Sequence, residues 1–266
     1  MTGGLLRSDL RPDAHLGYRL VLSAEQEPET GMTLGTWMLA PEELVLIGSA
    51  DSETAVLAFS GTGFLACAGR KLAFSRPNWV ETAPSVIHCG AGNSIEIFNA
   101  GKIPLEALIV QTRNPRKFPA RYYEATDIQI EHRGRGILQE TCHRIVRLVF
   151  DDGNGPQESN LVLGEVVNFA GRWSSYPPHS HPQPEIYYYR FDPPNGYGYG
   201  ELGDEVFKVR GGDLLAITNC RSHCQVSAPG YNMYYLWAVR HLEGNRYNGF
   251  TFDPEHAWTL NQRSTP

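Results

Sequence analysis

The sequence has 266 residues and a formal net charge of −6. An acidic chain argues against a nucleic-acid partner, because binding to a phosphate backbone usually relies on a basic face. No uninterrupted apolar run reaches the ~20 residues that a membrane helix requires, so we expect a soluble protein with no membrane partner.

The short apolar stretches of the chain favour an all-β fold. They alternate in hydrophobicity and are separated by turn residues, in a chain with 27 glycines and 18 prolines. This pattern is typical of an antiparallel sandwich or barrel. The predicted strands, in chain order, are residues 54–61, 94–100, 106–112, 143–150, 159–169, 185–191, 213–219 and 232–240.

Segment 112–136 is the best linker candidate, because it is rich in Arg, Pro and Gly and separates two β-rich halves. We therefore predict an N-terminal barrel over residues 1–125, a linker to about residue 136, and a C-terminal barrel over residues 137–266. The stretch "VIHCGAGNSIEIF" (86–98) resembles the surroundings of His223 but has no His-x-His partner. We expect His88 to be structural and the N-terminal barrel to lack a metal motif.

The cysteines suggest a reducing compartment. They form an odd set without CxxC spacing, and the chain opens without the apolar core of a signal peptide, so we expect free thiols and a cytoplasmic location. Cys220 and Cys224 flank His223, where a thiolate ligand and a small buried apolar residue are the two alternatives; the second is commoner. The five cysteines are Cys67, Cys89, Cys142, Cys220 and Cys224.

The stretch "HSHPQPE" carries the first part of a predicted metal site. In a strand, side chains two residues apart point to the same side, so His179 and His181 project together and Glu185 keeps their parity. Imidazole and carboxylate ligands suit a divalent Zn, Mn, Fe, Co or Ni ion. A His-x-His pair alone fits a polar turn equally well.

A second element strengthens the metal hypothesis. Gly212 opens a predicted strand, and a short turn after that strand would bring His223 back towards the first three ligands. Three histidines and one glutamate would leave one or two coordination positions open, as a catalytic metal requires.

These spacings resemble the two motifs of cupins, although Thr218 and Cys220 replace the usual Pro and Gly of the second motif. Most of the chain also resembles the 5-deoxy-glucuronate isomerase family of inositol catabolism, which is related to the 5-keto-4-deoxyuronate isomerases. The motifs that carry this resemblance are "GRWSSYPPHSH" (171–181), "EIYYYRFDPPNGYGYG" (185–200), "GYNMYYLWAV" (230–239) and "FDPEHAW" (252–258).

The resemblance implies a two-barrel bicupin whose C-terminal barrel holds a divalent metal on His179, His181, Glu185 and His223. It also implies a sugar-acid substrate, with 5-deoxy-glucuronate isomerised to 5-dehydro-2-deoxygluconate, and a homo-oligomer. The segment before Glu185 is shorter than in the family, and Glu140 replaces a usual Arg. An isomerase of another sugar acid and a non-catalytic sugar-binding or regulatory cupin therefore remain alternatives.

Several other residues are candidates for catalysis or substrate binding. Parity from Glu185 places Tyr187 and Tyr189 inward, where they would act in proton transfer or simply fill the barrel, and places Tyr188 and Arg190 outward. His256 is matched by the family's C-terminal motif, and an equal alternative is that its turn closes the barrel. The candidates for holding a substrate carboxylate, each with a surface role as the alternative, are Arg172, Lys208 and Arg210.

Overall fold

The computed structural model describes residues 3–8 and 15–263, and these are almost entirely β. Helical turns within this part of the chain are limited to η2 (Leu138–Glu140) and η3 (Ala257–Asn261). No helix among the described residues is long and apolar enough to cross a membrane. The predicted all-β class is confirmed.

The chain forms two compact units. The N-terminal unit contains Asp13–Gln129 and Val149–Val162, and the C-terminal unit contains Ile130–Leu148, the chain from Leu163 onwards and the N-terminal strand β1 (Gly4–Leu6). The structure therefore groups Val149–Val162 with the first barrel, whereas the division drawn from the sequence assigns them to the second.

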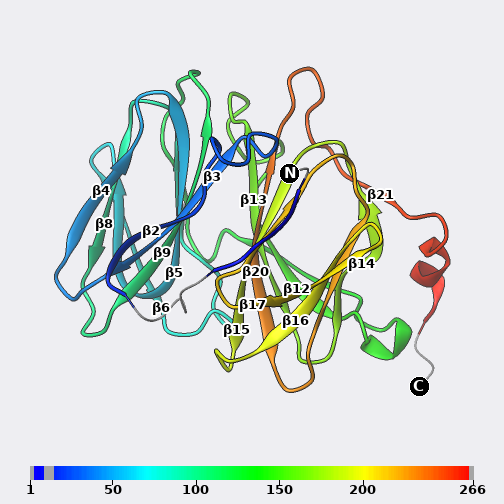
Figure 1. Cartoon of the computed structure of the whole chain (residues 1–266). Helices are drawn as coiled ribbons and strands as arrows, with labels where there is room; N and C mark the ends of the chain where they lie inside the picture. Colours follow the sequence, from blue (N-terminus) through cyan, green and yellow to red (C-terminus); the bar gives the residue numbers. More distant parts are fainter. Residues whose placement is uncertain (1–2, 9–14, 264–266) are drawn as a thin grey trace. The chain divides into compact units, whose positions relative to one another are not determined.

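The N-terminal unit is organised around the 16-residue strand β5 (Figure 1). This strand pairs with β7 and β9 along its first half and with β6 and β8 along its second. A shift of register between Ala58 and Ser60 marks the change of partners. The strands of the N-terminal unit are β2 (Gly17–Leu22), β3 (Met32–Leu39), β4 (Leu44–Gly48), β5 (Ser52–Cys67), β6 (Arg70–Arg76), β7 (Val86–Cys89), β8 (Ser94–Asn99), β9 (Leu105–Arg113) and β10 (Arg121–Tyr123).

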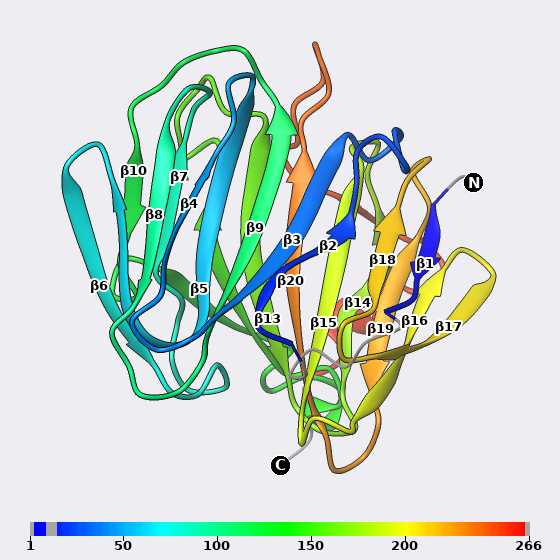
Figure 2. The same ribbon diagram turned by 60° about the vertical axis from the view of Figure 1, so that its left-hand side comes forward.

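Two sheets build the C-terminal unit. The seven-stranded sheet has the order β1-β18-β15-β20-β13-β12-β11, and the five-stranded sheet has the order β17-β16-β19-β14-β21. Figure 2 shows β18, β15 and β20 of the first sheet and β17, β16 and β19 of the second. The strands are β11 (Gln129–Arg133), β12 (Arg144–Phe150), β13 (Leu161–Asn168), β14 (Trp173–Ser180), β15 (Glu185–Asp192), β16 (Tyr197–Leu202), β17 (Glu205–Arg210), β18 (Leu214–Ile217), β19 (His223–Ser227), β20 (Asn232–Arg240) and β21 (Thr251–Phe252).

Strand β15 shows how sequence alternation builds the core of the C-terminal unit. Tyr187, Tyr189 and Phe191 join one buried apolar cluster with residues of β18 and β20, as their parity predicts. Tyr188 and Arg190 lie on the other face of the sheet, but they are also buried, and the Arg190 guanidinium donates a hydrogen bond to the Tyr188 hydroxyl. The outward face of β15 is therefore not a solvent face.

Candidate metal centre and active site

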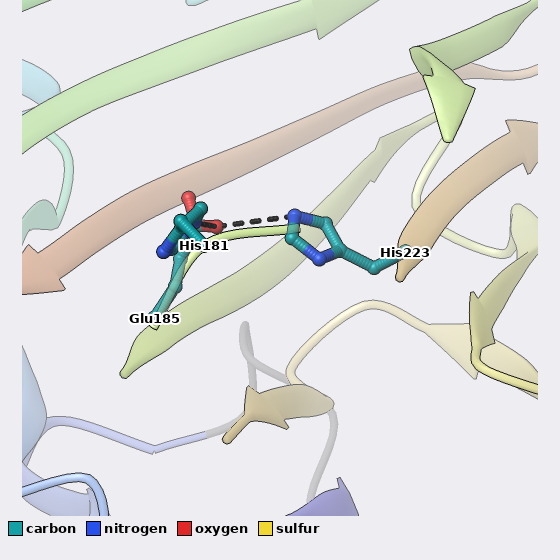
Figure 3. Close-up of side chains that lie close together, drawn as sticks. All are labelled: His181, Glu185 and His223. Carbon is teal, nitrogen blue, oxygen red and sulfur yellow. Dashed lines mark hydrogen bonds and ion pairs between the residues drawn. The ribbon is translucent and has the colours of Figure 1, made fainter. Parts of the chain in front are cut away.

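Three of the four predicted ligands converge in the C-terminal unit. Ligand atoms of His181, Glu185 and His223 lie within 4.8 Å of one another, and all three residues are buried. His181 follows the end of β14, Glu185 begins β15 and His223 begins β19, so both sheets contribute ligands. Figure 3 shows His181 beside Glu185, with His223 pointing towards them from the opposite side.

One carboxylate oxygen is the centre of this cluster. Glu185 Oε2 lies 3.0 Å from His181 Nε2 and 3.3 Å from His223 Nε2. Burial by itself raises the pKa of Glu185, but the neighbouring His181 and His223 outweigh this effect and lower that pKa to about 2. The carboxylate therefore stays ionised, as a metal ligand must.

The tautomer of His223 also fits a cation. Its Nδ1 lies 3.0 Å from the carbonyl oxygen of Arg221, and since a carbonyl can only accept, Nδ1 carries the hydrogen. In the neutral imidazole Nε2 then presents a lone pair, and this buried atom has no hydrogen-bond partner among the described residues. In this form the lone pair faces a carboxylate oxygen 3.3 Å away, and a proton or a metal cation between the two atoms removes the repulsion. Two imidazoles and one carboxylate are also ligand types that suit a divalent metal ion, so the donor set fits such an ion.

His179 lies next to this cluster but outside the convergent group. Its ring centroid is 4.6 Å from that of His223, its cross-strand partner. Its Nδ1 donates to the carbonyl oxygens of Ser175 and Pro177, at 3.1 and 3.2 Å, so Nε2 is the atom left to bind a metal. Burial, followed by the neighbouring His223, lowers the pKa of His179 to about 3 and keeps the imidazole neutral.

A buried polar network adjoins the ligands on the inner side of the barrel. The Tyr187 ring is 5.7 Å from the His223 ring, and its hydroxyl lies 3.2 Å from Ser175 Oγ. Ser175 Oγ also accepts from Gln225 and contacts the Tyr235 hydroxyl, at 3.1 and 3.3 Å. Burial raises the pKa values of Tyr187 and Tyr235, so both phenols remain protonated hydrogen-bond donors. Tyr189, also inward, donates to Gln225 Oε1 at 2.7 Å.

Within the described part of the chain, the other predicted residues make no hydrogen bond, ion pair or ring contact with the ligands. Lys208 and Arg210 alternate with the buried Val209 on β17 and therefore lie on the outer face of the five-stranded sheet, where the Lys208 ammonium is 4.2 Å from the Tyr197 ring centroid. Arg172 donates to His143 Nδ1 at 3.0 Å. His256 precedes η3, is partly exposed, and closes that turn through its backbone.

The segment that connects β20 to β21 covers part of the cluster with aromatic rings. The Phe250 ring is 4.2 Å from the His179 ring, and the Tyr247 ring is 4.9 Å from the His181 ring. Gln183, in the short stretch before Glu185, donates to the backbone oxygen and the side-chain oxygen of Asn245 at 2.9 and 3.1 Å. The short "PQP" stretch therefore holds this covering segment in place through the hydrogen bonds of Gln183.

Sequence reasoning missed Ser175, Gln225, Tyr235 and Gln183. Parity offered a signal for Gln225, because it is two residues from His223 in the same strand. No such signal existed for Ser175, which lies in a register shift of β14 and has a positive φ of 53°.

His88 is held in a buried ion pair, which suits the structural role expected for it. It is fully buried in the N-terminal unit, its Nε2 lies 3.0 Å from Glu53 Oε1, and its ring stacks on Phe150 at 4.1 Å. Glu53 also accepts from Ser159 and from the backbone of Asn160. Among the described residues of this unit, no group of three ligands comparable to the C-terminal cluster is present.

Two β-barrel units, with a buried His, Glu and His cluster in one of them, define a bicupin with a candidate metal centre. The chain belongs to the KduI/IolB family, whose model matches residues 10–259. It is 30% identical over 202 residues to the 5-deoxy-glucuronate isomerase of Bacillus subtilis strain 168, covering 68% of this chain and 72% of the relative.

Solved structures support the same fold. An IolB-like protein from Salmonella typhimurium LT2 superposes with a TM-score of 0.83 at 20% identity, covering 97% of this chain and 99% of that one. A variant of Bacillus subtilis oxalate decarboxylase superposes with a TM-score of 0.65 at 12% identity, covering 95% and 80%. The family and the fold expected from the sequence motifs are confirmed.

Proposed function

We propose that this protein is an aldose-ketose isomerase that converts 5-deoxy-glucuronate to 5-dehydro-2-deoxygluconate in inositol catabolism. The proposal is supported by membership of the KduI/IolB family and by the name of its Bacillus subtilis relative. The observation that carries it is the buried convergence of His181, Glu185 and His223 in a family of sugar-acid isomerases.

We assign these three side chains, with His179 as a fourth, as ligands of a divalent Zn, Mn, Fe, Co or Ni ion. Such an ion supplies Lewis acidity, which stabilises the negative charge that develops when a proton leaves the carbon beside a carbonyl. His179 and His223 are held in the required tautomer by backbone carbonyls. Glu185 is ionised and brings a negative charge, which attracts a cation to this site.

Tyr187 is our candidate for a proton donor to a substrate oxygen. It is the inward tyrosine nearest to the ligands, and its raised pKa keeps the hydroxyl protonated at neutral pH. Tyr189 is bonded to Gln225, so we assign it to positioning that side chain. We assign His256 a structural role, in which its backbone closes the turn before η3.

The test is turnover of 5-deoxy-glucuronate by the purified, metal-loaded protein, followed as the appearance of the ketone. A Glu185→Gln variant is the matched control, because it keeps the shape of the site and removes its charge. Turnover by the wild type and its loss in the variant would support the proposal. A folded, metal-loaded protein that leaves this substrate unchanged would contradict it, and turnover of 5-keto-4-deoxyuronate instead would identify the related sugar-acid isomerase.

We further propose a cytoplasmic location and a homo-oligomer. All five cysteines are free, which suits a reducing compartment. Leu16, Tyr18 and Leu20 are exposed at or beside the edge strand β2, and such an apolar edge favours contact with a second copy. Light scattering of the purified protein tests the oligomer, and a monomeric mass would contradict it.

A further inference from the structure

Arg144, at the start of β12, is a buried cation that the assigned chemistry does not use. Only 7% of its surface is exposed. It donates to two backbone carbonyls, those of Cys142 at 2.9 Å and Tyr176 at 3.2 Å. It forms no ion pair with any residue in the described ranges 3–8 and 15–263.

This arrangement is costly for a guanidinium. A buried charge is normally paired with an opposite charge, because the two together recover part of the lost hydration energy. Two carbonyls accept from only some of the five N–H donors, and they neutralise none of the charge. The buried Arg147 on the same strand shows the usual solution, since it pairs with Glu165 at 2.8 Å. Arg144 is therefore electrostatically incomplete.

Its position faces the inside of the barrel. Arg144 has the same parity as Val146, a member of the buried cluster that includes Tyr187 and Tyr235. The same two tyrosines are among the groups that interact electrostatically with its charge. Tyr235 and Tyr187 both contact Ser175 Oγ, at 3.3 and 3.2 Å, and the Tyr187 ring lies 5.7 Å from the His223 ring.

A line of polar groups therefore runs from the ligand cluster through Tyr187 and Ser175 to Tyr235, and Arg144 reaches the same place by its hydrogen bond to the backbone of Tyr176, the residue after Ser175. A sugar acid has the complementary pattern, with a carbonyl at one end, hydroxyls along the chain and a carboxylate at the other end. Arg binds carboxylates well because its planar fork can donate two parallel hydrogen bonds.

We propose that Arg144 binds the carboxylate of the sugar-acid substrate, while the carbonyl end lies at His181, Glu185 and His223. The identity of the ligand rests on the proposed function. In this assignment, an inward residue of β12 recognises the substrate carboxylate. It replaces Lys208 and Arg210, the candidates expected from the sequence, which lie on the outer face of β17.

The test compares an acid substrate with its neutral counterpart. Wild type, Arg144→Gln and Arg144→Lys are assayed with 5-deoxy-glucuronate and with 5-deoxy-glucose, which lacks the carboxylate. We expect Arg144→Gln to raise KM for the acid on the order of 100-fold while changing the neutral sugar little, so that the preference for the acid disappears. Arg144→Lys keeps the charge but not the fork, and should restore part of the preference.

A structural role for Arg144, as a clamp between Cys142 and Tyr176, gives a different result. Both substrates would then lose activity by the same factor, and that outcome overturns the proposal. Arg113→Gln is the control for loss of a cation, because Arg113 is exposed and lies in the other unit. If Arg144→Gln does not fold, Arg144→Lys still decides, since an equal loss on both substrates contradicts the proposal.

The failure of the proposed function would be seen separately, as wild type that does not convert 5-deoxy-glucuronate. Calorimetric titration with D-glucuronate and D-glucose then tests Arg144 by binding alone. Tighter binding of glucuronate by wild type, lost in Arg144→Gln, supports the assignment. A preference that survives the substitution, or wild type without any preference, overturns it.

Discussion

His179 and His223 are direct cross-strand partners of β14 and β19, and their imidazole centroids lie 4.6 Å apart. Each ring donates its Nδ1 hydrogen to a backbone carbonyl, so the two Nε2 atoms remain available as ligands. In the proposed metal site, the backbone of two paired strands would thus present both imidazoles in the tautomer that a metal ion requires.

The ligand cluster predicts unequal losses of metal. Glu185→Gln and His223→Ala should remove most of the bound metal, because they delete members of the convergent group. His179→Ala should weaken binding less, because its ring lies outside that group. Losing a residue that only orients a ligand costs roughly 10–100-fold in affinity, and we expect at least that for Glu185→Gln. Metal analysis and chelator competition measure this, with the exposed His15→Gln as control; unchanged metal in all variants would refute the site.

Tyr187→Phe should lower kcat more than it changes KM. Loss of a positioned proton donor costs about 100-fold or more in rate, whereas the hydroxyl's hydrogen bond to Ser175 contributes only about 1 kcal/mol to folding. Steady-state kinetics and thermal unfolding separate these effects. Tyr199→Phe, on the outer face of the five-stranded sheet, is the matched control. A Tyr187→Phe enzyme with wild-type kcat would show that the ring only fills the barrel.

Ser175 has a left-handed backbone conformation and a hydroxyl that forms hydrogen bonds with three side chains. Two substitutions separate the effects of the backbone and the hydroxyl. Ser175→Ala loses the hydroxyl and keeps the strain of φ 53°, while Ser175→Gly loses the hydroxyl and relieves the strain. We expect Ser175→Gly to be the more stable of the two by about 1 kcal/mol in the free energy of unfolding. Urea denaturation measures the difference. An alanine variant as stable as the glycine variant would argue that the backbone is unstrained.

Gln183→Ala should loosen the segment that covers the ligands. Two hydrogen bonds to Asn245 are lost, each contributing about 1 kcal/mol, so opening should become roughly tenfold more frequent or more. Trypsin cleavage after Arg246, within this segment, should accelerate accordingly in the native protein. Adding Arg246→Gln should abolish the new cleavage. An unchanged cleavage rate would mean that Gln183 does not hold the segment.

Glu53 predicts a pH-dependent stability in the N-terminal unit. Burial raises its pKa, but the hydrogen bond and charge of His88, with Asn114 and Asn160, hold that pKa below its ordinary value of 4.5. The ionised form is therefore favoured by folding, and its stabilisation is present above pH 4.5 and is lost as the pH falls towards the folded value. Glu53→Gln should cost about 3 kcal/mol at neutral pH.

The measurement for Glu53 is the melting temperature of wild type and Glu53→Gln between neutral and acid pH. We expect the gap between the two proteins to narrow below pH 4.5, because wild type alone loses the interaction. A gap that is constant with pH would contradict the assignment.

The sequence by itself determined the β class and the family, and it predicted the ligand types. All eight predicted stretches contain strands, because alternating apolar residues between turns have few other ways to bury one face. The His-x-His-x3-Glu spacing predicted ligands locally, within seven residues of chain. Parity also assigned Tyr187 and Tyr189 to the inner face of β15.

Tertiary structure decided everything that depends on which strands meet. Segment 149–162 groups with the N-terminal unit through partners such as Glu53, more than 90 residues earlier, which no local pattern records. Only the pairing of β14 with β19 places Ser175 beside Tyr187, Gln225 and Tyr235. Arg144, Arg172 and Arg210 are equally cationic in the sequence, and only burial distinguishes the one that faces the barrel interior without an opposite charge.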